Sequence, residues 1–355
     1  MSDHIDRATG VRKSEELDLD VLRPYLAQEL GTSADDLEVE QFPGGHSNLT
    51  YLLKMGGREY VMRRPPFGSK VKKAHDMGRE HRVLSALSAV RDWAPRPVVF
   101  CEDPSVLGAD FYLMERIEGV ILRRKIPDGV TVDEAKAQHL CETLLDTLVD
   151  LHSLDVDEVG LDDLGRPEGY VERQVTGWAK RYEGSKTDDI PQMPEVARWL
   201  ADHMPPSPAA CIIHNDYKFD NVVYDSIAFD RIVGVLDWEM ATVGDPLMDL
   251  GTTLCYWVEE GDADGLKNLA FSPTMRPGFM SRRQLAERYA AQTGRDLGHI
   301  NFYFTFGLFK TAVVLQQIYY RWKQGLTKDP RFGGLIFGVK LLAEAAEGAI
   351  AKGEL

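Results

Sequence analysis

The most constraining feature of the chain is a polar cluster enclosed between short apolar runs. Residues 211–224 begin with Cys-Ile-Ile and end with Val-Val-Tyr, and a histidine, two aspartates, a lysine and two asparagines lie between these runs. A further apolar run, 233–236, ends on the carboxylate of Asp237. Short apolar runs rich in β-branched residues predict buried strands. We therefore expect strands to carry Asp216, Asn221 and Asp237 to one end of a sheet, where their oxygens would suit a hard cation and its phosphate.

The residue types in this cluster are those that phosphoryl transfer requires. The reaction needs a carboxylate near the acceptor hydroxyl, a cation that neutralises the transferred group, and oxygen ligands for Mg²⁺. Asp216 fits the first role, Lys218 the second and Asn221 the third, while His214 is expected to shape the loop backbone. The alternative is a polar turn between two strands. The complete set of residues at this spacing favours the catalytic interpretation.

Three carboxylates that follow the cluster are expected to serve the same site. A carboxylate at the end of a buried strand is costly unless it is paired or bound to a metal, so we interpret Asp237 as a metal ligand rather than a helix N-cap. Asp245 precedes Pro246 and is predicted to cap a helix, because proline is favoured at the first helical position. Asp249 lies one turn further along and is expected to brace the catalytic loop.

A glycine-containing loop near the N-terminus is a candidate phosphate contact. Residues 43–48 read Pro-Gly-Gly-His-Ser-Asn and lie between two strand-like runs. Glycines let backbone N–H groups approach phosphates closely, and no Gly-Lys-Ser or Gly-Lys-Thr sequence follows, so the loop is not a Walker A motif. A plain hairpin would explain it equally well. The predicted nucleotide contacts here are Gly45, Ser47 and Asn48.

An arginine on the third strand is the candidate cation for the α- and β-phosphates. Arg63 ends that strand, and Glu80 lies on the helix that follows, so the two are expected to pair. The alternative is a surface ion pair, which would contribute little to stability. Arg64 is a competing candidate, but the alternation of side chains along a strand puts it on the opposite face.

The extended segment 111–119 is expected to contact the adenine ring. Its backbone N–H and C=O groups can hydrogen-bond a planar base, and Met114, Glu115 and Ile117 are the predicted contacts. A core strand that leads into a linker is the alternative, and both interpretations can hold together.

The order of predicted elements divides the chain into two parts. A helix at 17–30 ends at Gly31, strands follow at 37–42, 49–54 and 59–63, then a helix at 74–90 and strands at 97–101 and 111–117. From residue 132 onward, helices are predicted at 133–154, 168–184, 194–204, 246–257, 281–292, 299–323 and 331–351. We expect an α+β protein with a flexible N-terminus (1–16), a small β-rich N-lobe (17–119) and a larger, mainly helical C-lobe (120–355).

Composition excludes several classes of partner. The net charge of −15 opposes non-specific binding of nucleic acid or anionic lipid. No apolar run approaches the roughly 18 residues of a membrane span, and the N-terminus lacks the apolar core of a signal peptide. The four cysteines are scattered, which is typical of reduced core residues. These features predict a cytoplasmic protein that binds neither nucleic acid nor membrane, and they leave its oligomeric state undefined.

Taken together, these motifs resemble those of the aminoglycoside phosphotransferase and choline kinase-like family. The most specific part is His214-x-Asp216-x4-Asn221 followed by Asp237, and the resemblance covers about residues 36–325. It implies the bilobal fold of protein kinases, with ATP and Mg²⁺ as cofactors. It also implies that Asp216 is the catalytic base and that Asn221 and Asp237 are the Mg²⁺ ligands.

Within that family, the chain is most similar to a bacterial branch related to kinase-like domains found with acyl-CoA dehydrogenases. The similarity lies in the strings 45–51, 60–63 and 236–246. It implies that some members phosphorylate hydroxyacyl-CoA intermediates. The chain departs from well-studied kinases at Arg63, where they carry a lysine, and arginine can hold phosphates through two parallel hydrogen bonds.

The sequence thus predicts an ATP- and Mg²⁺-dependent small-molecule kinase whose acceptor is an alcohol bound between the lobes. Three alternatives remain open. An aminoglycoside kinase should carry acidic residues in its acceptor pocket, whereas a hydroxyacyl-CoA kinase should carry an apolar slot and a basic rim. The candidate rim residues are Lys70, Lys72, Lys73, Arg321 and Lys323. The third alternative is a nucleotide-binding module without catalysis.

Overall fold

The computed structural model describes residues 8–42, 48–67, 76–327 and 329–355. The chain divides into two compact units, each considered by itself below. Unit 1 comprises Met1–Ile121 and Val222–Ala241, and unit 2 comprises Leu122–Asn221 and Thr242–Leu355.

Unit 1 is built on a five-stranded antiparallel sheet with the order β1-β2-β3-β5-β4. At the turn between β2 and β3, Gly56 and Gly57 both have positive φ (57° and 69°), as the tight two-residue turn of a hairpin requires. The strands are β1 (Glu38–Gln41), β2 (Leu49–Met55), β3 (Arg58–Arg64), β4 (Pro97–Cys101) and β5 (Phe111–Glu115).

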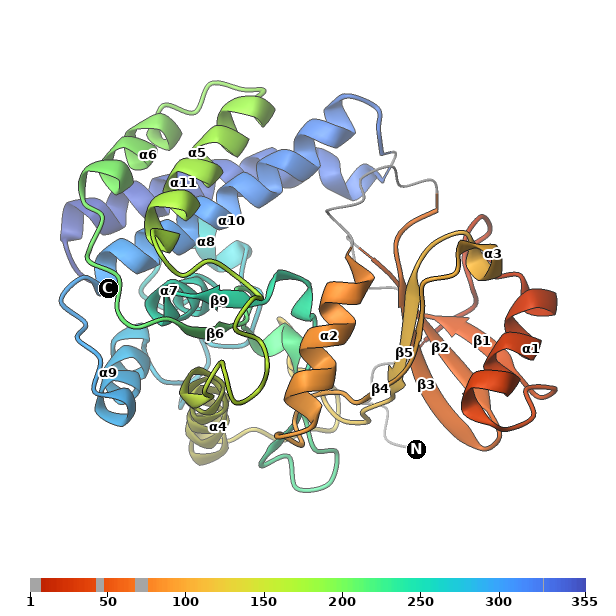
Figure 1. Ribbon diagram of the computed structural model, residues 1–355. Helices are drawn as coiled ribbons and strands as arrows, with labels where there is room; N and C mark the ends of the chain where they lie inside the picture. The colour runs from red at the N-terminus through yellow and green to blue at the C-terminus, as the bar shows by residue number, and fades with distance from the viewer. Residues whose placement is uncertain (1–7, 43–47, 68–75, 328) are drawn as a thin grey trace. The chain divides into compact units, whose positions relative to one another are not determined.

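Helices cover both faces of this sheet (Figure 1). Helix α1 (Leu19–Leu30) is capped by Asp18, ends at the left-handed Gly31 and packs on one face together with the short α3 (Pro104–Leu107). Helix α2 (Met77–Ser88) packs on the other face through an apolar stripe. Because neighbouring residues of a strand face opposite sides, β4 and β5 supply side chains to the packing on both faces.

A hairpin from later in the chain completes unit 1. It consists of β7 (Val222–Tyr224) and β8 (Ile232–Val235), which pair in antiparallel fashion. The hairpin is tied to the earlier segment by a bridge between Val120 and Tyr224 and by stacking of Trp93 on Trp238 with ring centroids 5.9 Å apart. Gly119 permits this approach, because a Cβ there would lie 2.2 Å from the carbonyl oxygen of Tyr224.

Unit 2 contains a separate two-stranded sheet of β6 (Cys211–Ile213) and β9 (Thr242–Gly244). The prediction that the strands before Asp216 and before Asp237 share one sheet is wrong. The strand before Asp216 is β6, whereas the strand before Asp237 is β8 of unit 1. The physical reason is β9, an unpredicted three-residue strand whose backbone takes the edge of β6.

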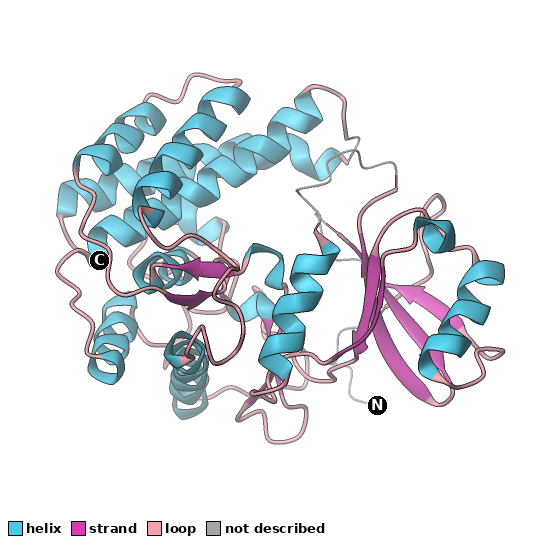
Figure 2. Cartoon of the chain, viewed as in Figure 1, coloured by secondary structure: helices cyan, strands magenta, loops and turns pink. Residues whose placement is uncertain are grey.

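Helices make up most of the remainder of unit 2 (Figure 2). The seven predicted helices are confirmed, with ends shifted by a few residues, and the short α8 was not predicted. They are α4 (Glu134–Ser153), α5 (Tyr170–Ser185), α6 (Gln192–Asp202), α7 (Pro246–Cys255), α8 (Asp264–Asn268), α9 (Arg282–Thr293), α10 (Ile300–Lys323) and α11 (Leu335–Lys352). Within the described residues, no helix is both long and apolar enough to cross a membrane.

Helix α10 is the central helix of unit 2, packed against α5, α6, α7 and α11. Its contact with α7 is unusually close because two glycines face each other there. A Cβ at Gly307 would lie 2.5 Å from the carbonyl oxygen of Gly251, and one at Gly251 would lie 2.3 Å from the carbonyl oxygen of Tyr303. This close packing matters for the site, since α7 and α10 both carry side chains that hold the loop after β6.

Candidate active site

The loop that follows β6 is held by a buried carboxylate on α7. Asp249 is fully buried, and its two oxygens accept hydrogen bonds from the backbone N–H groups of His214 and Asn215, each at 2.7 Å. The same carboxylate contacts Nε2 of His152 at 3.2 Å. Burial by itself would raise the pKa of Asp249, but these partners hold it below its ordinary value. The geometry agrees with the predicted bracing of the loop.

Asn215 adopts a left-handed backbone, with φ of 66°. Asparagine tolerates this conformation better than most residues do, and three contacts fix it here. Its N–H is bound to Asp249, its side-chain oxygen accepts from the hydroxyl of Tyr170 at 3.3 Å, and its carbonyl accepts from Nζ of Lys310 at 2.6 Å. The backbone N–H, the backbone carbonyl and the side-chain oxygen of the residue before Asp216 are therefore all held.

Asp216 is surrounded by hydrogen-bond donors. Its Oδ1 accepts from the hydroxyl of Tyr256 at 2.7 Å, and its Oδ2 accepts from Nζ of Lys218 at 2.7 Å and from Nδ2 of Asn221 at 3.0 Å. The backbone N–H of Asp216 donates to Nδ1 of His214 at 3.2 Å, so the buried histidine shapes the loop as expected. The Asp216 side chain is 18% exposed, which leaves it accessible to a substrate. Asp216, Lys218 and Asn221 thus converge within unit 2.

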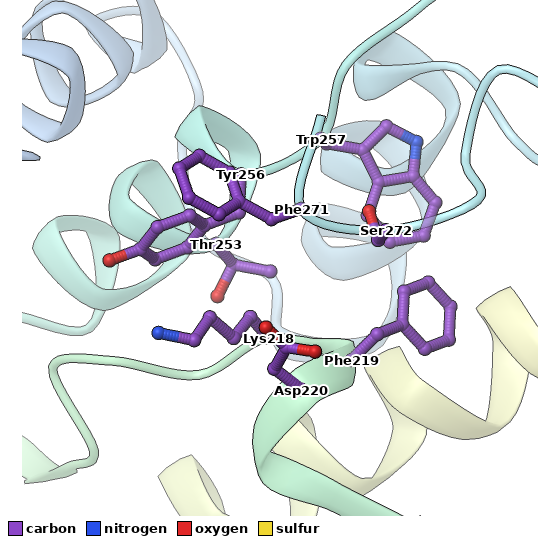
Figure 3. A pocket seen from close by; sticks show the side chains of 8 residues that line it. All are labelled: Lys218, Phe219, Asp220, Thr253, Tyr256, Trp257, Phe271 and Ser272. Atoms are coloured by element: carbon purple, nitrogen blue, oxygen red, sulfur yellow. The ribbon is translucent and has the colours of Figure 1, made fainter. Parts of the chain in front are cut away.

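A small depression beside Lys218 adjoins this carboxylate (Figure 3). It is shallow and narrow, with room for little more than a water molecule between its lining side chains. In Figure 3 the amino group of Lys218 and the hydroxyl of Tyr256 extend toward the same side, and Nζ of Lys218 lies 4.5 Å from the centre of the Tyr256 ring. The lining residues are mostly aromatic or uncharged: Lys218, Phe219, Asp220, Thr253, Tyr256, Trp257, Phe271 and Ser272.

The N-terminus of α7 has the predicted cap. Asp245 accepts from the backbone N–H of Leu247 at 2.8 Å and from the hydroxyl of Tyr303 at 2.9 Å. Burial raises the pKa of Asp245 to about 6, although these hydrogen bonds lower it. The cap fixes the start of the helix that carries Asp249 and leads into Tyr256.

A second charged cluster lies in unit 1 around Arg63. The guanidinium is 3.0 Å from Glu80, 3.0 Å from Asp237 and 3.6 Å from Glu239. Arg63 and Glu80 are both buried, so the alternative of a surface ion pair does not apply. Burial opposes the charge on Arg63, but the neighbouring acidic groups, Glu80 foremost, raise its pKa well above the ordinary value. Arg64 lies on the other face, as alternation predicted, with its guanidinium over the ring of Phe67.

Asp237 occupies an unusual backbone conformation just after β8. Its φ and ψ are 67° and 60°, a left-handed region that costs a residue with a Cβ about 1–2 kcal/mol. The side chain makes no capping hydrogen bond to the short 3₁₀ turn that follows, which removes the N-cap alternative. Asn48 reaches the same cluster by donating to Glu239 at 2.9 Å. Gly45 and Ser47, the other loop candidates, lie outside the described residues.

The predicted adenine segment is the end of β5 and the residues after it. Met114 is buried in the sheet, and Glu115 is the exposed last residue of the strand. The N–H of Glu115 donates to the carbonyl of Arg96, so this donor is used within unit 1. Ile117 packs where Gly234 lacks a side chain. Nucleotide contact by Met114, Glu115 and Ile117 stays a prediction.

Two side chains at the loop were missed by the sequence analysis. Tyr256 lies between Cys255 and Trp257 and resembled a core aromatic. Lys310 did leave a signal, because it is a charged residue within the apolar run of α10, and a lysine in that position is buried only at a cost.

The sequence of the chain matches a model of the phosphotransferase enzyme family over residues 38–291. The chain belongs to this family. Among curated proteins, acyl-CoA dehydrogenase family member 11 of Rattus norvegicus is 34% identical over 322 residues, covering 89% of this chain and 41% of that protein. The probable acyl-CoA dehydrogenase IBR3 of Arabidopsis thaliana is 31% identical over 342 residues, covering 90% and 41%. The chain therefore spans about two-fifths of the length of these relatives.

Solved structures agree with this assignment. A putative aminoglycoside phosphotransferase from Ralstonia eutropha JMP134 is 30% identical and has a TM-score of 0.80, covering 95% of this chain and 99% of that one. A macrolide 2′-phosphotransferase type I shares the fold at 18% identity with a TM-score of 0.62, covering 94% and 97%. The predicted family and the predicted α+β fold are confirmed.

Proposed function

We propose that the chain transfers the γ-phosphoryl group of ATP, with Mg²⁺, to an alcohol group of a small molecule. The observation that carries this proposal is the environment of Asp216. This accessible carboxylate accepts hydrogen bonds on both oxygens, and the loop that carries it is held by Asp249. A carboxylate in such a setting can accept a hydrogen bond from an alcohol and take its proton as the new bond to phosphorus forms.

The other polar groups have complementary roles in this proposal. Lys218 lies beside Asp216 and supplies a mobile positive charge for the transferred phosphoryl group. Arg63, with Asn48 nearby, is the cation for the α- and β-phosphates, and Gly45 and Ser47 belong to the same contact set. Fixed charges of this kind stabilise charge that develops in the transition state.

The proposed metal ligands Asn221 and Asp237 fit Mg²⁺ chemically. The amide nitrogen of Asn221 donates to Asp216, so the amide oxygen is not used in that contact and is the atom that would bind Mg²⁺. Asp237 is a half-exposed carboxylate held at Arg63. Within the described ranges, no three His, Cys, Asp or Glu side chains form a group that could hold a metal on their own. That suits Mg²⁺, which usually takes one or two protein oxygens and completes its shell with phosphates and waters. When bound, Mg²⁺ would neutralise phosphate charge.

The depression beside Lys218 bears on the acceptor. Its four aromatic residues and single carboxylate suit an acceptor with an apolar part better than a polycation such as an aminoglycoside. The relatives named as acyl-CoA dehydrogenase family members support the same direction. We therefore propose a hydroxyacyl-CoA or a related metabolite as the acceptor. Of the candidate basic rim, Lys70, Lys72 and Lys73 lie outside the described residues, and Lys323 pairs with Asp188 at 3.2 Å.

The test is acceptor-dependent ADP release with Mg²⁺ and ATP across hydroxyacyl-CoAs, aminoglycosides, sugars and choline-like amines. We expect turnover with one class that falls by at least about a thousandfold in Asp216→Ala, because base and orientation are lost together. Asp146→Ala, which removes an exposed carboxylate of α4, is the control and should be unchanged.

Each other outcome has a distinct meaning. Turnover that survives Asp216→Ala would remove the assignment of the base. Binding of ATP without turnover of any acceptor would favour the nucleotide-binding module. Turnover restricted to aminoglycosides would overturn the proposed acceptor but leave the reaction in place.

A further inference from the structure

Lys310 is a buried lysine that has no carboxylate partner among the residues that the structure describes. Its side chain lies inside unit 2 with only 5% of the residue exposed. Its Nζ donates to the carbonyl of Asn215 at 2.6 Å and lies 5.9 Å from the centre of the Trp178 ring. Within the part of the chain that the structure describes, no carboxylate oxygen lies within 4.0 Å of Nζ of Lys310, the limit for an ion pair.

Such a residue is expensive to keep for stability alone. A buried ammonium without an ion-pair partner costs several kcal/mol, and an apolar side chain of the same volume usually packs at least as well. Burial lowers the pKa of Lys310, while the more distant carboxylates of Asp216 and Asp249 act in the opposite direction. The close packing of α10 on α7 at Gly307, one turn earlier, brings Lys310 to the loop.

We propose that Lys310 is a positioning residue for phosphoryl transfer, which fixes the peptide group between Asn215 and Asp216 and thereby the direction of the Asp216 side chain. This inference rests on the proposed role of Asp216 as the base. The carbonyl that Lys310 binds belongs to the same peptide group as the N–H that Asp216 donates to His214.

The loop is thus held by opposite charges on its two sides. Asp249 binds the N–H groups of His214 and Asn215, and Lys310 binds the next carbonyl. Hydrogen bonds to charged groups are about twice as strong as neutral ones. Together they hold Asn215 in its left-handed conformation, which has to persist for the following residue to reach Tyr256 and Asn221.

The test compares Lys310→Met with a matched control on the same helix. Gln316→Met also replaces a long, buried polar side chain, which donates to the carbonyl of Ser185 at 2.7 Å. Two readouts are needed. Hydrogen–deuterium exchange of residues 211–221 reports the loop without requiring activity, and steady-state kinetics with Mg²⁺-ATP separate kcat from KM.

For Lys310→Met we expect at least tenfold faster exchange in the loop and a kcat about a hundredfold lower, with the KM for ATP within about twofold. Gln316→Met should lower the melting temperature but leave loop exchange and kcat unchanged. Lys310→Arg retains the charge and the donor, so it should recover most of the protection of the loop against exchange. If Lys310→Met does not fold, Lys310→Arg is compared with wild type instead.

The possible failures can be told apart. Wild-type exchange and kcat in Lys310→Met would overturn the positioning role. A parallel loss of kcat in Gln316→Met would also overturn it, because general destabilisation would then suffice. Faster loop exchange in a protein that phosphorylates nothing would support the positioning role and contradict the proposed function.

Discussion

The two charged clusters of the molecule are built with opposite balances. In unit 1, a single guanidinium, Arg63, meets the carboxylates of Glu80, Asp237 and Glu239. In unit 2, a single carboxylate, Asp216, meets an ammonium, a phenol and an amide. The first cluster therefore gathers carboxylates around one described cation, whereas the second gathers donors around one carboxylate.

This difference matches two tasks of phosphoryl transfer, which are to bind a metal cation and to orient the acceptor hydroxyl. Carboxylate oxygens gathered at one place are the ligand type that Mg²⁺ takes, which supports the proposal that a cation binds at Asp237. A carboxylate held by donors on both oxygens is fixed in direction and ready to receive one more hydrogen bond. The following predictions change one cluster or its support at a time.

The largest effect is expected from Arg63→Met. Glu80 is almost fully buried, and removal of its partner would leave an uncompensated charge. Breaking a buried ion pair in this way typically costs about 3–5 kcal/mol. Chemical denaturation should show this loss in the free energy of unfolding.

Two further variants show whether the cost lies in the unpaired carboxylate. Arg63→Met combined with Glu80→Met removes both charges and should recover most of the stability. Arg64→Met, on the opposite face of the same strand, removes a cation that lies over Phe67, and should cost about 1 kcal/mol. An equal loss in the Arg63 and Arg64 variants would mean that packing, not charge, holds the cluster.

Local patterns were sufficient to predict that Arg63 and Arg64 face opposite sides of their strand and that Asp245 caps a helix. A strand alternates its side chains, and a helix begins at a short polar residue before proline, so both predictions depend only on neighbouring residues. The same holds for the long helices and for the hairpin at Gly56-Gly57.

Pairing between distant segments could not be predicted in the same way. Three-residue strands such as β9 carry too few residues for a period, so the partner of β6 was not foreseen. Tyr256 and Lys310 reach the loop only because α7 and α10 pack closely through Gly251 and Gly307. Their roles depend on a contact between two helices, and no spacing in the sequence encodes it.

The next effect concerns the support of the Asp216 cluster and depends on pH. Asp245 has a folded pKa of about 6 against an ordinary value of 3.8, because it is buried. The folded state therefore holds this proton more tightly than the unfolded state does. Protonated Asp245 contributes stability at low pH, and this contribution is lost as pH rises through about 6. Asp245→Asn keeps a good N-cap and does not titrate.

Denaturation of both proteins between pH 4 and 7 provides the measurement. The stability of Asp245→Asn relative to wild type should increase with pH by on the order of 3 kcal/mol, at 1.36 kcal/mol per unit of pKa shift. Asp133→Asn, at the exposed N-cap of α4, should follow the wild-type profile. A parallel profile for Asp245→Asn would show that Asp245 is already ionised in the folded protein at pH 4.

The smallest effect is expected from Tyr256→Phe, which removes the hydroxyl that donates to Asp216 and keeps the ring. Burial, reinforced by the nearby Asp216 carboxylate, raises the pKa of Tyr256 well above its usual value, so the phenol remains a donor at neutral pH. The phenyl ring still lies under Lys218. One hydrogen bond to a charged group is worth about 1.5 kcal/mol, so kcat should fall by up to about tenfold, the KM for ATP should stay nearly constant, and the free energy of unfolding should fall by no more than about the same 1.5 kcal/mol.

Tyr182→Phe is the matched control, because Tyr182 is a buried tyrosine of α5 whose hydroxyl makes no described contact with Asp216. Its kcat should equal that of wild type. If Tyr256→Phe also retains full kcat, Lys218 and Asn221 would be sufficient to orient the Asp216 carboxylate. A hydrogen bond to Oδ1 would then not be required for activity. If kcat instead increases, the phenol competes with the acceptor hydroxyl for Oδ1, and the three donors of this cluster would restrain the base as well as orient it.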